Sequence, residues 1–105
     1  MDDIEIHKGY VPGAIGRVIE LHGTHYHANW GFGAFFEARV ASELAEFIGS
    51  YDAQRDGFWT AAVDGRVEGS LTIDGVHAAH KGAHLRWFIL SERLRGKGVG
   101  SPFRR

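Results

Sequence analysis

The dipeptide Asp64-Gly65 separates two stretches of the chain that have the character of β-strands. Residues 58–63 before it are mostly apolar, and apolar and polar residues alternate over 67–73 after it. An Asp-Gly pair between such runs is typical of a two-residue type I′ turn, whose central residues both need positive φ. The segment therefore predicts a β-hairpin, and a second Asp-Gly pair at 74–75 predicts the end of its second strand.

Two helical patterns precede this hairpin. The first predicts a helix over residues 12–22, with Pro12 in its first turn and Gly23 as its stop. The second lies between Gly33 and Gly49, and its apolar residues recur mostly at intervals of three and four: Phe36, Val40, Leu44, Phe47 and Ile48. Such a stripe is expected to pack into the core of a small domain, and a partner-binding surface is the alternative.

Short strands at 4–8 and 83–90 complete the predicted order of elements, which is β, α, α, β, β, β and a final loop. The expected fold class is α+β, in layers: a mostly antiparallel sheet of about four strands with two N-terminal helices. A chain of 105 residues is long enough for a single domain.

Composition narrows the class of protein further. The chain has no cysteine, and it has neither a basic N-terminal leader nor an apolar run of membrane-spanning length. These features predict a soluble cytoplasmic protein without a membrane partner. The net charge of −1 gives no general attraction to nucleic acid, so no nucleic-acid partner is expected.

The last predicted strand leads into a basic, glycine-rich segment, RGKGVG, at 95–100. Glycines allow consecutive backbone N–H groups to turn toward one point, and the side chains of Arg95 and Lys97 add positive charge. This combination predicts a site for an anionic group such as a pyrophosphate. A solvated basic tail is the alternative, because three further arginines lie nearby in the sequence.

The order of elements, ending in a strand that leads into RGKGVG, resembles the GNAT superfamily of acetyl-coenzyme A-dependent N-acetyltransferases. Their signature is Arg or Gln, two free positions, Gly, one free position, and Gly or Ala; Arg95, Gly98 and Gly100 occupy the fixed positions. Segments along nearly the whole chain, such as WTAAVDGRVEGS at 59–70, also resemble the acetyltransferase domain fused to MarR-type regulators. The resemblance covers the N-terminal two-thirds of such a domain, so residues 1–105 are expected to form a single, C-terminally truncated domain.

This resemblance implies where acetyl-coenzyme A would bind. Backbone amides of the glycine-rich loop would hold the pyrophosphate, and the preceding strand would offer main-chain groups to the pantetheine arm. The cofactor-binding residues so implied are Phe88, Ile89, Leu90, Arg95, Gly96, Lys97, Gly98, Val99, Gly100 and Ser101. Pro102 lacks the N–H that a helix starting near Gly98 would need, so binding is expected to be weakened.

The acceptor implied by the resemblance is an amine of unknown identity. His22 and Tyr26 match a family segment near the acceptor site, which implies a role in substrate binding. The sequence identifies no catalytic residue; Glu68 is a candidate general base, and strand alternation makes a solvated surface charge the alternative. The seven histidines fall partly into two groups, at 22–27 and 77–84, but without cysteine or a nearby carboxylate they predict no metal site.

Two functions remain open from the sequence alone. The first is an N-acetyltransferase domain that binds acetyl-coenzyme A, and the second is a catalytically inactive remnant that serves as a small dimerising module. In the last predicted strand, Leu85, Trp87 and Ile89 would share one face, and Phe88 and Leu90 the other. Without the elements beyond the loop these faces would be uncovered, which predicts a homodimer.

Overall fold

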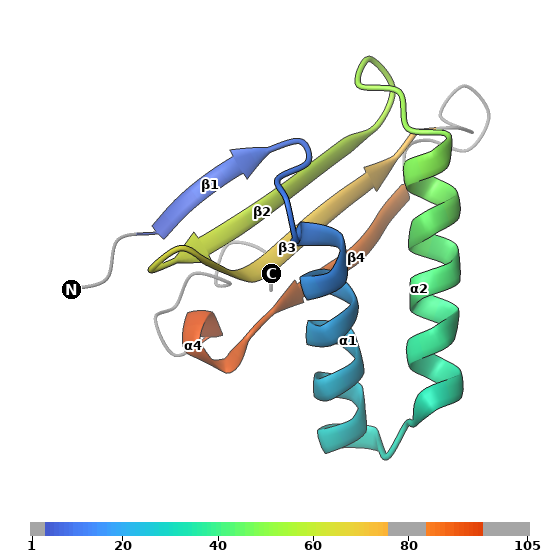
Figure 1. Cartoon of the computed structure of the whole chain (residues 1–105), viewed down its shortest axis with the longest axis vertical. Helices are drawn as coiled ribbons and strands as arrows, with labels where there is room; N and C mark the ends of the chain where they lie inside the picture. The colour runs from blue at the N-terminus through green and yellow to red at the C-terminus, as the bar shows by residue number, and fades with distance from the viewer. Residues whose placement is uncertain (1–3, 76–83, 96–105) are drawn as a thin grey trace.

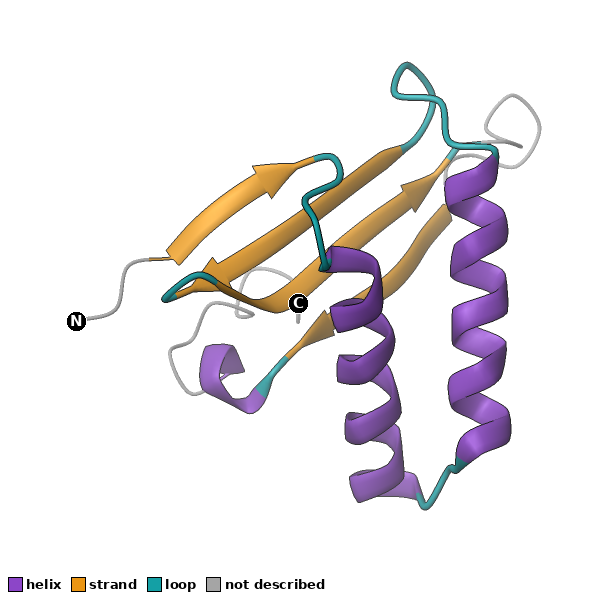
Figure 2. Cartoon of the chain, in the orientation of Figure 1, coloured by secondary structure: helices purple, strands orange, loops and turns teal. Residues whose placement is uncertain are grey.

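The structure is a computed structural model that describes residues 4–75 and 84–95. Its elements follow one another as β1 (Ile4–Lys8), α1 (Ala14–Trp30), α2 (Ala34–Gly49), β2 (Gly57–Val63), β3 (Arg66–Asp74), β4 (His84–Leu90) and α4 (Glu92–Arg95). The strands form one sheet, and α1 and α2 lie side by side across one of its faces (Figures 1 and 2). The predicted α+β fold is confirmed.

The four strands lie in the order β1-β2-β3-β4, and each pairs antiparallel with its neighbour. The turn between β2 and β3 contains Asp64 and Gly65, whose φ angles of 53° and 78° are those of a type I′ turn. The predicted hairpin is therefore confirmed, and it fixes the register of the two central strands.

Helix α1 is longer than the sequence predicts, because it continues through Gly23 to Trp30. It begins at Ala14 and is capped after Trp30 by Gly31, which has a φ of 73° and donates its N–H to the His27 carbonyl at 3.0 Å. Gly23 is buried where a Cβ would collide with the Glu37 side chain of α2. The predicted stop at Gly23 is wrong, because packing holds the helix on both sides of this glycine: Val18 and Leu21 are buried before it, and Tyr26 contacts Phe36 after it.

The predicted apolar stripe of α2 faces the core, with Val40, Leu44 and Phe47 buried. The main cluster lies between the helices and the sheet and contains Ala14, Val18, Leu44, Phe47 and Phe58. A second cluster closes the sheet at the α4 end and contains Ala61, Val63, Leu90 and Leu94. Among the described residues, no helix is both long and apolar enough to cross a membrane.

A β-bulge in β4 changes which side chains share a face of the sheet. The register between β3 and β4 shifts between Ser70 and Thr72, and Trp87 has a φ of 50°. Trp87 consequently packs on Phe47 of α2, on the same side as Arg86, whose guanidinium carbon lies 4.0 Å from the Trp87 ring centre. The expectation that Leu85 shares the face of Trp87 is wrong, because the bulge interrupts the alternation between them.

Candidate functional site

Only some of the predicted cofactor-binding residues lie in the part of the chain that the structure describes. Phe88, Ile89 and Leu90 form the last part of β4, and Arg95 ends α4. The remaining ones lie outside the described residues: Gly96, Lys97, Gly98, Val99, Gly100 and Ser101. The described members thus belong to one continuous β4–α4 segment, and their role in cofactor binding stays a prediction.

The α4 turn follows β4 directly and was not predicted from the sequence. Ser91 donates its N–H to the Glu68 carbonyl at 2.7 Å, and the Ser91 carbonyl accepts the N–H of Arg95 at 3.0 Å. The Leu94 side chain is fully buried and holds the turn against the sheet. A single apolar residue among charged ones is the only signal for this turn, and four residues are too few to show a helical period.

A cleft of about 330 Å³ lies between α1 and the β4–α4 turn. Its lining comes from two segments that are far apart in the sequence: Arg17, Leu21, Thr24, His25, Ala28 and Asn29 from α1, and Leu90, Ser91 and Glu92 from the turn. The cleft brings one predicted cofactor-binding residue, Leu90, to the α1 segment that carries the predicted substrate residues. We take this cleft as the candidate functional site.

An ion pair between α1 and β3 flanks this cleft. Arg17 Nη2 lies 2.9 Å from Glu68 Oε1, and Arg17 Nε donates to the Val67 carbonyl at 2.7 Å. The side chains are only 16% and 8% exposed, so the pair is shielded from water. The register shift between Ala61 and Ala62 leaves Glu68 as the extra residue of a second β-bulge.

The ion pair with Arg17 changes the interpretation of Glu68, the candidate general base. The interpretation of Glu68 as a solvated strand charge is wrong, because the bulge leaves its side chain buried on Arg17. A catalytic role for Glu68 stays a prediction, and a base at this position would first have to release the Arg17 guanidinium.

His25 is the titratable ring of the cleft, and it lies near both charged ends of α4. Partial burial lowers the pKa of His25, and the positive charge of Arg95 lowers it further, whereas the Glu92 carboxylate raises it. The net direction is downward, so the imidazole is neutral at pH 7. From the sequence, His25 enters only as a member of the histidine group at 22–27, for which no metal site is predicted, and Asn29 carries no signal, because the predicted helix ends before both residues.

His22 and Tyr26, the predicted substrate residues, stack on each other with parallel rings 6.3 Å apart. His22 is buried, its Nδ1 lies 2.9 Å from the Val18 carbonyl, and burial lowers its pKa. Tyr26 also contacts Phe36 of α2 and the edge of His25, at ring distances of 4.9 and 5.1 Å. The structure thus places an aromatic array beside the cleft, and the substrate-binding role of its members stays a prediction.

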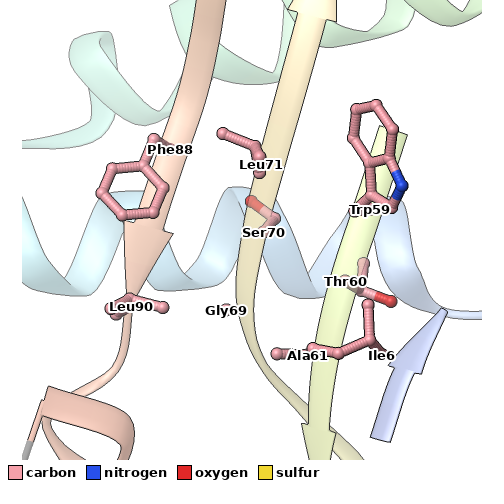
Figure 3. Close-up of a pocket in the computed structure, with 9 residues that line it drawn as sticks. All are labelled: Ile6, Trp59, Thr60, Ala61, Gly69, Ser70, Leu71, Phe88 and Leu90. Carbon is pink, nitrogen blue, oxygen red and sulfur yellow. The ribbon is translucent and has the colours of Figure 1, made fainter. Parts of the chain in front are cut away.

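An apolar groove of about 300 Å³ lies on the sheet face opposite α1 and α2 (Figure 3). Trp59, Leu71 and Phe88 lie in one row across three strands, and Leu90 closes the groove near α4. Phe88 and Leu90 therefore connect this groove with the predicted cofactor-binding strand. Within residues 4–75 and 84–95, no three His, Asp or Glu side chains are grouped so that they could hold a metal ion.

No protein-family model matches the chain, and no curated protein matches it either. Among solved structures, it is similar to a protein of Desulfovibrio desulfuricans assigned to the GNAT family of acetyltransferases, with a TM-score of 0.67 and 16% sequence identity. That match covers 95% of this chain and 60% of the other. A predicted acetyltransferase of Clostridium acetobutylicum, solved with acetyl-CoA, matches with a TM-score of 0.62 and 10% identity, over 96% and 68% of the two chains.

The described elements form a partial GNAT fold. At these sequence identities the similarity establishes the fold and not the activity. The chain spans 60% of the length of the Desulfovibrio protein. The closer resemblance to domains fused to MarR-type regulators stays a prediction.

Proposed function

We propose that this GNAT-fold domain binds acetyl-coenzyme A and transfers its acetyl group to an amine. The observation that carries the proposal is the position of Arg95, the first residue of the signature, at the end of α4, shortly after the segment Leu90–Glu92 that lines the cleft. The similar Clostridium structure contains acetyl-CoA, which supports the same ligand for this fold.

The free edge of β4 suits the pantetheine arm. β4 is the last strand in the sheet order, and no other strand of the described residues pairs with its outer edge. Unpaired N–H and C=O groups along a strand edge can bind an extended chain that carries amides of its own. The arm would follow β4 toward Phe88 while the signature loop holds the pyrophosphate.

The transfer itself is a nucleophilic substitution at the thioester. The acceptor ammonium first gives a proton to a carboxylate or to water, and the neutral amine then attacks the carbonyl carbon, which forms a C–N bond. The C–S bond breaks, and the departing thiolate takes a second proton from the nitrogen. The products are an amide and free coenzyme A.

Titration with acetyl-coenzyme A, followed by thermal unfolding, tests the proposal. A ligand that binds the folded state raises the melting temperature, by an amount that grows with ligand concentration. We expect such a rise for the wild-type chain and for Gly49→Asp, at an exposed position at the end of α2. Gly98→Asp should abolish the rise in melting temperature, because it puts a negative charge in the signature loop, where the negatively charged pyrophosphate would bind. An unchanged wild-type melting temperature at millimolar ligand would contradict the proposal.

The apolar groove favours a second candidate function, self-association through the open face of the sheet. Ile6 and Leu85 are exposed large apolar residues of the two edge strands, and Ile6 lines the groove. Burying such a surface in a homodimer would remove it from water. Light scattering should then give twice the 11.6 kDa chain mass, and Ile6→Lys should restore the monomer. A wild-type monomer at high concentration would contradict self-association and leave the acetyltransferase proposal standing.

A further inference from the structure

The side chain of Asn29 contacts both the backbone and the ring of His25 in the cleft. Asn29 lies one helical turn after His25, and its Nδ2 donates to the His25 carbonyl at 2.8 Å. This bond determines which end of the Asn29 amide is the nitrogen, because a carbonyl oxygen accepts only from a donor. The same Nδ2 lies 3.3 Å from Nδ1 of the His25 ring.

This contact selects one tautomer of His25. An amide nitrogen donates and does not accept, so Nδ1 must carry the lone pair. The proton of the neutral imidazole is then on Nε2. Within the described part of the chain, this Nε2–H has no hydrogen-bond partner.

The charges around His25 decide what this N–H can bind. Arg17 and Glu92 line the cleft, and Arg95 lies near the ring from the end of α4. Glu68 and Glu20 neutralise the charge of Arg17, and Glu92 opposes that of Arg95, so the described residues give the cleft no surplus positive charge to attract an anion. An ammonium group cannot accept a hydrogen bond. An uncharged carbonyl oxygen is the group that suits a neutral N–H donor at this place.

We propose that His25 donates its Nε2–H to a carbonyl oxygen of the pantetheine–thioester arm of acetyl-coenzyme A. The inference rests on the proposed function, and it assigns His25 as a hydrogen-bond donor and not as a base. A base would take up its proton at Nδ1, and Asn29 already occupies that lone pair. The lowered pKa of His25 agrees with this assignment, since it keeps the ring neutral.

Nitrogen-15 NMR of the full chain tests the tautomer directly. In the free protein the two ring nitrogens of His25 should show the shifts of an Nε2–H imidazole. Acetyl-coenzyme A should move the Nε2 resonance and slow the exchange of its proton, a change that a purely structural role would not cause. An Nδ1–H tautomer, or an Nε2 resonance that saturating ligand leaves unmoved, would overturn the proposal.

Calorimetric titration with acetyl-coenzyme A gives the second test. His25→Ala should weaken binding about tenfold, as expected for one lost hydrogen bond, and His25→Gln should recover part of it because its amide also donates. His7→Ala on β1, at the far edge of the sheet, should bind like the wild type. Unchanged affinity in His25→Ala would refute only the role of His25, whereas a wild type that does not bind would refute the proposed function as well.

Discussion

Replacing Arg17 by methionine is expected to destabilise the domain strongly, because the change leaves the Glu68 carboxylate buried without a counter-charge. The Arg17 side chain is 16% exposed and that of Glu68 is 8% exposed, so water can replace little of the lost interaction. Removing one partner of a buried pair costs about 3–5 kcal/mol. This is a large part of the about 5–15 kcal/mol that a typical domain has in total. Urea unfolding followed by tryptophan fluorescence measures the difference.

A matched control is available on α2. Arg39 and Glu43 form an ion pair of similar length, 3.1 Å, but their side chains are 65% and 44% exposed. Arg39→Met should therefore cost about 0.5 kcal/mol or less. The double variant Arg17→Met/Glu68→Gln should lose less than the sum of the single losses, since the two groups contact each other. A loss below about 1 kcal/mol in Arg17→Met would refute the expectation that the buried Glu68 carboxylate depends on Arg17 as its counter-charge.

Three further predictions concern stability. Arg55 and the N–H groups of Gly75 and Asp52 lower the pKa of Asp56 below its ordinary value of 3.8. The ionised Asp56 therefore stabilises the fold above that value, and this stabilisation is lost as pH falls. In a plot of the urea unfolding midpoint against pH, Asp56→Asn should reduce the decline on the acid side. Burial lowers the pKa of His22, so stability should fall as pH drops below 6.5, and His22→Met should reduce that slope between pH 7 and 5. Gly69→Ala should cost about 1–3 kcal/mol in urea unfolding, because its Cβ would lie 2.7 Å from a Leu90 methyl.

Local signals in the sequence were sufficient for much of the fold. The Asp64-Gly65 turn and the apolar stripe of α2 each follow from residues that are close in sequence, and the structure has both. The length of α1 could not be predicted in this way. Gly23 weakens an isolated helix by about 1 kcal/mol, but Val18, Leu21 and His22 of α1 are buried in the folded domain, and this tertiary packing keeps the helix continuous.

The candidate site was less accessible to sequence reasoning because both β-bulges depend on partner strands. Strict alternation places Glu68 in solvent, whereas the bulge turns it toward Arg17 of α1, about fifty positions earlier in the sequence. Resemblance to a known family led to Leu90 and Arg95, but not to His25 and Asn29. Those two residues reach the cleft only because α1 continues past the predicted end of the helix.

The most direct measurement of the central claim is an NMR titration of the nitrogen-15-labelled full chain with acetyl-coenzyme A. The account predicts saturable shifts of backbone amides from His25 to Asn29 and from Leu90 to Glu92, which line the cleft, and in the rest of α4 up to Arg95, with β1 unchanged. The absence of shifts at millimolar ligand, or shifts confined to the apolar groove around Trp59 and Leu71, would contradict it.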